Sequence, residues 1–122
     1  MSGVIDQTRI AELVAIAATR EEGYQFVQEL TNSLFEKMPL QIIGLQQAVM
    51  SRDHKAAELL AHQLKGLCAN LGILNLSVLF EVIEEESRLG LGNRSQEAAN
   101  SLQHEFALAK SALEYLQHSK VA

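Results

Sequence analysis

Apolar residues recur at three- and four-residue steps along almost the whole chain, which is the spacing that puts them on one side of an α-helix. This pattern predicts five helices, over residues 6–18, 21–50, 53–71, 75–89 and 95–118. The alternation of apolar and polar residues that is typical of a strand is nearly absent. We therefore expect an all-α fold.

Several residues carry local signals for where these helices begin, bend or end. Asp53 is a favourable N-cap residue, and Gly72 suits the left-handed position that follows a helix C-terminus. Asn93 with Gln96 three positions later resembles a capping box. Pro39 removes one backbone donor, so the second helix is expected to kink there or to restart with the proline in its first turn.

The long predicted helices are joined by short connections, which is typical of antiparallel neighbours. The last helix carries a seam of apolar residues with the spacing of heptad a and d positions: Ala98, Leu102, Phe106, Ala109, Leu113 and Leu116. The expected architecture is an up-and-down antiparallel four-helix bundle with a short extra N-terminal helix. At 122 residues, the chain is expected to form one domain, 1–122.

Composition narrows the classes of function. Hydrophobic residues make up 48% and charged residues 20%, and the formal net charge of −5 gives no basic surface for nucleic acid or an anionic membrane. There is no uncharged apolar run of the roughly 20 residues that a membrane span requires. Cys68 is the only cysteine, which excludes an intrachain disulfide and a thiolate metal cluster. We expect a monomer in the cytoplasm, or a piece of a longer membrane-bound chain.

The predicted third helix carries a histidine opposite its apolar stripe. With His62 at zero on a helical wheel of about 100° per residue, the stripe lies roughly 140 to 240° away. It consists of Ala57, Leu60, Leu64, Leu67, Cys68 and Leu71. The imidazole of His62 is therefore expected to point to solvent.

Other residues lie within about 60° of His62 on the same face. They are Lys55, Glu58, Leu59, Lys65, Gly66 and Ala69. A glycine in mid-helix costs about 1 kcal/mol relative to alanine, and no core contact explains Gly66 on this face. A missing side chain beside an exposed histidine, with the small Ala69 one turn on, is useful if another protein comes close to the ring. Lys65 could place its ammonium in front of the imidazole.

Imidazole is well suited to carry a phosphoryl group. Its unperturbed pKa of about 6.5 leaves it largely neutral and nucleophilic near neutral pH without a buried base. Phosphoryl transfer depends mainly on alignment and on charge neutralisation, and a partner can supply both. No intrinsic cofactor is expected, and Mg²⁺ would come with the partner.

The run Ala61-His62-Gln63-Leu64-Lys65-Gly66, continued by Asn70-Leu71-Gly72, Leu76, Leu79 and Glu84, closely resembles the signature of histidine phosphotransfer (HPt) domains of multistep phosphorelays. The resemblance also includes the Phe26 to Ala48 helix with Pro39. Leu67 and Cys68 depart from it, because many members have Ser or Gly there.

The resemblance implies that His62 accepts a phosphoryl group on Nε2 from the aspartate of one receiver domain and passes it to another. The partners would be response-regulator receiver domains and a hybrid histidine kinase. In similar domains Lys65 contacts the phosphoryl group and Gly66 makes room for the receiver. A polar residue at the position of Glu84 accepts a hydrogen bond from the other ring nitrogen.

Two alternatives to the phosphorelay carrier stay open. The chain could be the phosphoacceptor domain of a chemotaxis-type histidine kinase, or a non-catalytic helical bundle that binds a signalling partner as an adaptor. An enzyme with its own turnover is not expected, because the sequence has no nucleotide-binding loop, no evident catalytic carboxylate pair and no serine or cysteine triad.

The remaining candidates have a plain structural interpretation beside the functional one. Part of the first predicted helix, Ile10, Leu13 and Val14, either packs on the bundle or forms with Leu59 an apolar collar for docking a receiver. His54 and His104 are interpreted as surface residues, and His118 as part of a fraying last turn. No metal site is expected, because His54 and His62 diverge by roughly 80° and no Glu-x-x-His pair is present. Of Glu84, Glu85 and Glu86, two are interpreted as a solvated acidic patch.

Overall fold

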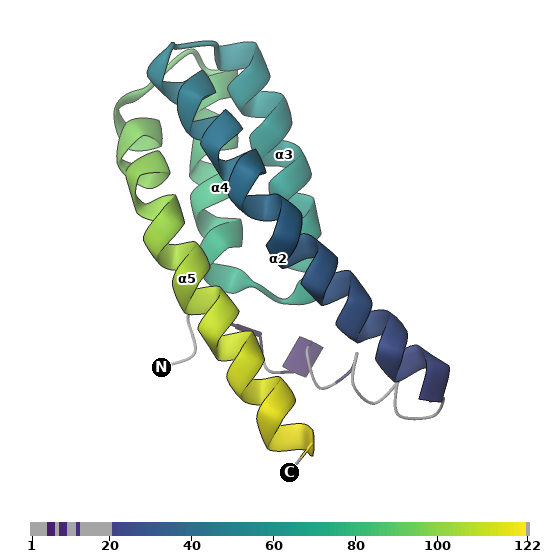
Figure 1. Ribbon diagram of the computed structural model, residues 1–122. Helices are drawn as coiled ribbons and strands as arrows, with labels where there is room; N and C mark the ends of the chain where they lie inside the picture. The colour runs from purple at the N-terminus through teal and green to yellow at the C-terminus, as the bar shows by residue number, and fades with distance from the viewer. Residues whose placement is uncertain (1–4, 7, 10–11, 13–20, 122) are drawn as a thin grey trace.

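The structure is a computed structural model that describes residues 5, 6, 8, 9, 12 and 21–121. Within these residues the chain forms four helices: α2 (Glu21–Met50), α3 (His54–Leu71), α4 (Leu74–Arg88) and α5 (Asn93–Val121). Consecutive helices run in opposite directions and are joined by short turns (Figure 1). The predicted all-α, up-and-down four-helix bundle is confirmed. The predicted first helix, 6–18, lies mostly outside the described residues.

Local signals in the sequence account for the ends of α3. The Asp53 side chain accepts a hydrogen bond from the backbone N–H of Ala56, so it caps the first turn as predicted. Gly72 adopts the left-handed conformation at φ 75°, and its N–H donates to the carbonyl of Ala69. At Pro39 the helix neither ends nor restarts, since α2 continues through it to Met50.

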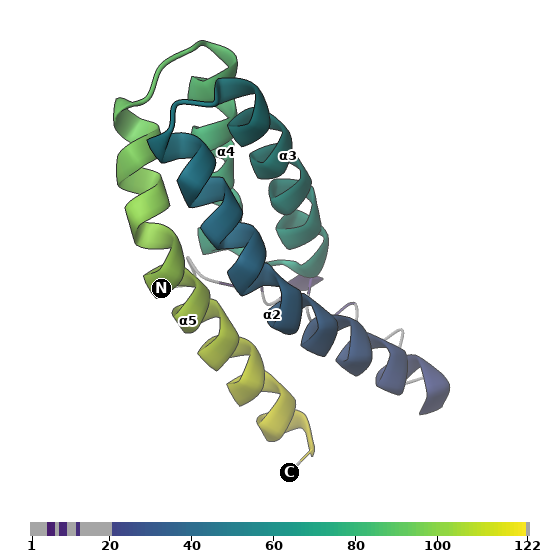
Figure 2. The same cartoon turned by 45° about the horizontal axis from the view of Figure 1, so that its top comes forward.

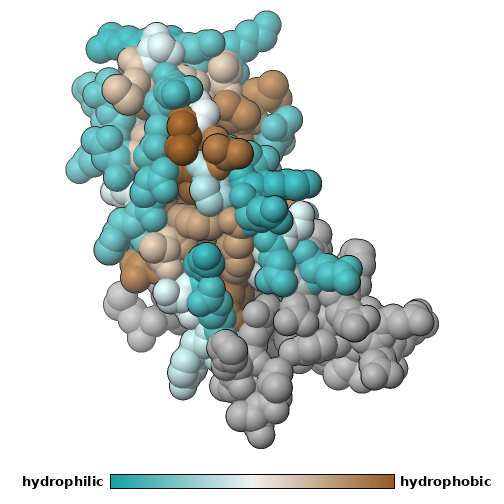
Figure 3. Space-filling view, in the orientation of Figure 1, coloured by the Kyte–Doolittle hydropathy of each residue, from teal (hydrophilic) through white to brown (hydrophobic). Residues whose placement is uncertain are grey.

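The core lies between the four helices. Its largest fully buried apolar side chains come from all of them and from the α3–α4 turn: Met38, Ile42, Leu45, Cys68, Ile73, Leu76, Phe80, Ile83 and Leu102. Phe35 of α2 meets Phe106 of α5 edge to face, with ring centroids 5.7 Å apart. On the face formed by α2 and α5, apolar surface lies between the two helices and polar surface on either side (Figure 3). None of the described helices is apolar enough over a sufficient length to span a membrane.

The start of α5 differs from the prediction. The helix begins at Asn93, and the N–H of Ser95 in its first turn donates to Oε1 of Glu86 at 2.6 Å. The predicted capping box of Asn93 and Gln96 is wrong, because Asn93 is already part of the helix and the N–H of Gln96 donates to the carbonyl of Gly92. Glu86 is only 8% exposed, so its interpretation as part of a solvated acidic patch is also wrong.

At the opposite end of the bundle, α2 and α5 extend beyond α3 and α4 (Figures 1 and 2). Ile5 is buried at 5% exposure and forms an isolated antiparallel bridge with Ile73 in the α3–α4 turn. Ile5 thus belongs to the core at the α3–α4 turn.

Candidate functional site

His62 lies in the middle of α3 on the side that faces away from the core. Its side chain is 65% exposed. The opposite side of the helix is buried in the bundle through Ala57, Ala61, Leu64, Cys68 and Leu71. Because helical geometry separates the two sets, the residues that pack the core also force the imidazole outward.

One ring nitrogen of His62 is held by a carboxylate of the neighbouring helix. Nδ1 of His62 lies 2.7 Å from Oε2 of Glu84 in α4, and the Glu84 side chain is 13% exposed. A neutral imidazole that donates its Nδ1–H to this carboxylate has its lone pair on Nε2. No described residue forms a hydrogen bond with Nε2. The exposed nitrogen is thus the one that can react.

Lys65 shares the same carboxylate. Its Nζ lies 2.6 Å from Oε1 of Glu84, so the two oxygens of Glu84 bind one residue each. The sequence placed the ammonium in front of the imidazole, whereas the structure pairs it with Glu84 beside the ring. Lys65 is one helical turn from His62, and its side chain is 31% exposed.

The ion pair between Lys65 and Glu84 shifts the pKa values of both side chains. The hydrogen bond to Glu84 is the main reason that the pKa of Lys65 is raised above its ordinary value. Burial alone would raise the pKa of Glu84, but the hydrogen bonds from Lys65 and His62 outweigh it and lower that pKa. Near neutral pH the site therefore holds a carboxylate and an ammonium next to the imidazole.

Next to His62, the exposed side of α3 has small residues at the positions where the sequence predicted room for a partner. Gly66 is exposed, and a Cβ added to it would meet no atom within 4 Å, so packing within the described chain does not require a glycine there. Ala69 is exposed, Leu59 is 58% exposed, and Glu58 is half-buried on the same helix. The proposed collar residues Ile10, Leu13 and Val14 lie outside the described residues.

The other chemically interesting side chains are placed elsewhere. Cys68 is fully buried, and this burial raises the pKa of its thiol to about 12, in line with its expected role as a small core residue. His54 is partly exposed and His104 is exposed, while the side chain of His118 is outside the described part. Among the described residues, no cluster of three or more His, Cys, Asp or Glu could hold a metal ion.

Reasoning from the sequence missed the bond between Lys65 and Glu84. These residues are on different helices and 19 positions apart, so no helical spacing relates them. The signal that could have found it is the implied contact of Glu84 with His62, because Lys65 follows His62 by three residues. Two residues on one face of α3 can reach the same carboxylate.

One of the comparisons with known proteins found a match, and it covers most of the chain. A family model described as "Hpt domain" matches residues 29–118, which include all of α3 and α4 and most of α2 and α5. No curated protein and no solved structure gave a match.

Proposed function

The chain belongs to the Hpt domain family, and from this premise we propose that His62 is the phosphoacceptor, which takes a phosphoryl group from a receiver-domain aspartate and passes it to another receiver. The observation that carries the proposal is the orientation of the ring. Nδ1 is bound to Glu84, while Nε2 faces outward on a side chain that is 65% exposed. A carrier that serves two proteins in turn needs its reactive atom on an open surface.

The transfer step follows from this orientation. The lone pair of Nε2 attacks the phosphorus of the aspartyl phosphate, and the bond between phosphorus and the aspartate oxygen breaks. Its electron pair stays on the aspartate carboxylate. The imidazole keeps the proton on Nδ1 and becomes positively charged while it carries the phosphoryl group. The reverse step hands the group to the next aspartate.

Glu84 has two roles in this proposal. As a hydrogen-bond acceptor 2.7 Å from Nδ1, it fixes the tautomer that leaves Nε2 unprotonated. As an anion with a lowered pKa, it stabilises the positive charge of the phosphorylated ring.

Lys65 provides positive charge close to the phosphoryl oxygens. Its ammonium already lies at the site through Glu84, so contact with a phosphoryl group on Nε2 requires only a rotation of its flexible side chain. The divalent cation that phosphoryl transfer uses, Mg²⁺, would be brought by the receiver domain. Hpt domains are phosphocarriers rather than enzymes, and this chain has no turnover of its own in the proposal.

The receiver would dock over the exposed side of α3. Gly66 and Ala69 allow its backbone to approach, and Leu59 and Glu58 offer contacts beside the ring. Ile10, Leu13 and Val14 complete the proposed apolar collar. A hybrid histidine kinase would supply the phosphoryl group at the start of the relay, and the chain would act as a cytoplasmic monomer.

The proposal is tested by phosphoryl transfer from isolated receiver domains labelled with radioactive acetyl phosphate. The wild-type chain should acquire an acid-labile, base-stable label, and His62→Gln should reduce it at least 100-fold. His104→Gln replaces another exposed histidine and should keep the label. A label that survives in His62→Gln contradicts the assignment.

The open alternatives give different results in the same assay. A label that arrives only from the ATP-binding domain of a chemotaxis-type kinase, and from no receiver, would make the chain a kinase phosphoacceptor domain. A wild-type chain that takes no label from either donor would be an adaptor.

A further inference from the structure

Three described residues near the N-terminus contact the end of the helix that carries His62. We call Ile5, Asp6 and Arg9 the N-terminal strap. The N–H of Asp6 donates to the carbonyl of Gly72 at 2.6 Å, and Ile5 bridges to Ile73. These residues precede the range 29–118 that the family model matches. The strap therefore lies outside the part of the chain that the family model covers.

Gly72, at the end of α3, lies in close contact with two residues of the strap. A Cβ added to Gly72 would lie 3.2 Å from Cβ of Arg9 and 3.2 Å from the carbonyl oxygen of Asp6. Its φ of 75° also disfavours other residues. Any side chain at Gly72 would thus strain the helix end and displace the strap, so this glycine serves both features.

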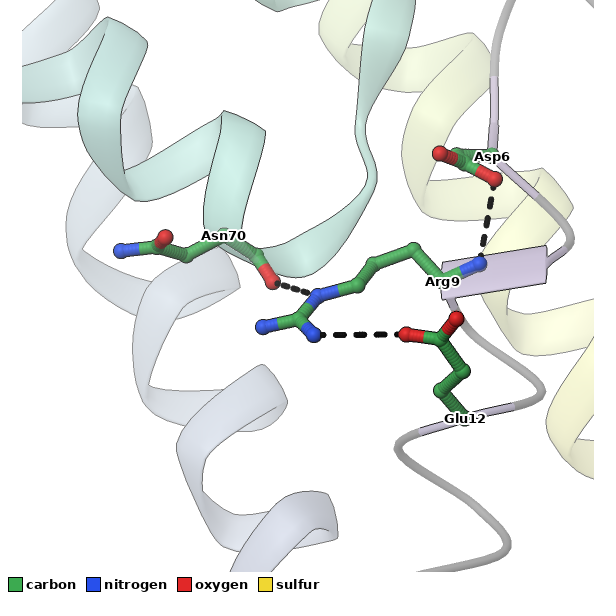
Figure 4. Close-up of polar contacts among 4 residues, drawn as sticks. All are labelled: Asp6, Arg9, Glu12 and Asn70. Carbon is green, nitrogen blue, oxygen red and sulfur yellow. Dashed lines mark hydrogen bonds and ion pairs between the residues drawn. The ribbon is translucent and has the colours of Figure 1, made fainter.

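Arg9 makes the polar connection between the strap and α3 (Figure 4). Its Nε donates to the carbonyl of Asn70 at 3.0 Å, its Nη1 lies 3.6 Å from Glu12, and its backbone N–H donates to the Asp6 carboxylate at 3.1 Å. The last turn of α3 contains no basic residue of its own. Arg9 therefore supplies the cation that a helix C-terminus favours.

This connection lies close to the reactive ring. Asn70 follows His62 by eight residues, which is about 12 Å along the helix and roughly 80° around it. A specific interface of standard size buries about 800 Å² on each partner, which corresponds to a disc of roughly 16 Å radius. An interface of this size centred on His62 is large enough to reach the end of α3. Gly66 and Ala69, both exposed, lie between the two points.

We propose that Arg9 is a positioning residue for phosphoryl transfer between proteins: it fixes the N-terminal strap at the end of α3 so that the strap forms one edge of the receiver-docking surface. The inference rests on the proposed function of His62. Arg9 does not touch the reacting atoms, so its loss should weaken docking and leave the reactivity of the imidazole intact.

The test compares two phosphoryl donors on the full chain. One is an isolated receiver domain phosphorylated with acetyl phosphate and chosen as the fastest donor to the wild-type chain. The other is phosphoramidate, a small donor that needs no docking surface. Arg9→Ala should raise the receiver concentration at half-maximal rate at least threefold. The maximal rate and the rate with phosphoramidate should stay within twofold of wild type.

Two further variants separate docking from general stability. Arg9→Lys keeps a cation that can reach the Asn70 carbonyl and should restore most of the loss. Glu12→Gln removes the ion pair but leaves the bond from Arg9 to Asn70, and its half-saturating concentration should match wild type. Circular dichroism at the assay temperature verifies that each variant is folded.

The inference is overturned if Arg9→Ala changes the half-saturating concentration less than threefold. It is also overturned if labelling by phosphoramidate falls in parallel with transfer from the receiver, because the effect would then lie in the ring or the fold. Failure of the proposed function looks different, since the wild-type chain itself would take no label on His62 from any receiver domain, whatever its labelling by phosphoramidate.

Discussion

The buried side and the exposed side of α3 differ in whether packing explains their residues. On the buried side, Ala57, Ala61, Leu64 and Cys68 are at most 2% exposed and close against the other helices. On the exposed side, the chain has a helix-weakening glycine, a leucine in solvent and a histidine tied to a carboxylate. The first side follows what packing requires. The second has features that packing does not explain, and these are the features that a docking partner would use.

The comparison separates stability from transfer, and this separation can be tested by substitution. A change on the buried side should alter the free energy of unfolding and leave the chemistry of His62 alone. A change at an exposed position of α3 should alter transfer and should not lower the free energy of unfolding. Each prediction below tests one part of this division.

The largest effect on stability is expected for Leu64→Ala. Leu64 is 2% exposed, and removing a buried leucine side chain costs roughly 3 kcal/mol through lost burial and the cavity that remains. Urea denaturation should measure this loss, while the rate of labelling by phosphoramidate, per folded molecule, should stay within about twofold. A loss below about 1 kcal/mol would mean that this side of α3 is not packed as described.

A smaller and pH-dependent effect is expected for Glu84→Gln. The glutamine can still accept a hydrogen bond from Nδ1 of His62, but it has no charge to pair with Lys65. For a partly buried ion pair we expect a loss of about 1 kcal/mol near neutral pH. The phosphorylated ring should also lose stabilisation, so the phosphohistidine should hydrolyse faster.

The sign of the pH dependence follows from the two pKa shifts. Glu84 has a lowered pKa in the folded chain, so its contribution is complete above its unfolded pKa of about 4.3 and is lost as the pH falls through the folded value. Lys65 has a raised pKa, so its contribution is complete below about 10.4 and is lost as the pH rises through the folded value. The stability difference from wild type should therefore shrink as the pH falls below about 5 and as it rises above about 10.

Glu85→Gln is the matched control for this experiment, because Glu85 is the exposed neighbour of Glu84 on α4. It should show no comparable difference at any pH. An equal stability loss in both variants, or a gap that widens in acid, would argue against the ion pair.

The smallest effect on stability, with the opposite sign, is expected for Gly66→Ala. Because a Cβ there meets nothing within 4 Å, alanine should stabilise the helix by roughly 0.5–1 kcal/mol. Transfer from a receiver should nevertheless slow, and Gly66→Gln should slow it more, since each added atom holds the partner away from the ring.

Gly44→Ala provides the stability control, because this glycine of α2 also has open space where a Cβ would stand. Both alanine variants should raise the midpoint of thermal unfolding. Unchanged transfer in Gly66→Gln would contradict the hypothesis that a glycine is needed here for the backbone of a receiver domain to approach His62.

Local features of the fold could be predicted from the sequence because their causes are close together in the chain. The period of apolar residues fixed which side of each helix is buried. Asp53 and Gly72 marked the ends of α3, since each acts on backbone groups within four residues of itself. The outward orientation of His62 was predicted from its position opposite the apolar stripe on a helical wheel.

Contacts between distant residues could not be predicted in this way. Glu86 caps α5 from α4, Lys65 shares Glu84 with His62, and Arg9 binds the carbonyl of Asn70, which is 61 positions away. Each of these depends on how two elements meet, and a helical period contains no information about that. The contact between His62 and Glu84 was expected only through the family resemblance.

The most direct test of the central claim is nitrogen NMR of the imidazole rings in the ¹⁵N-labelled chain, before and after phosphorylation by a receiver. The account predicts that His62 in the free chain has its proton on Nδ1 and that phosphorus then appears on Nε2 of this ring alone. Phosphorus on Nδ1 of His62, or on another histidine, would contradict it.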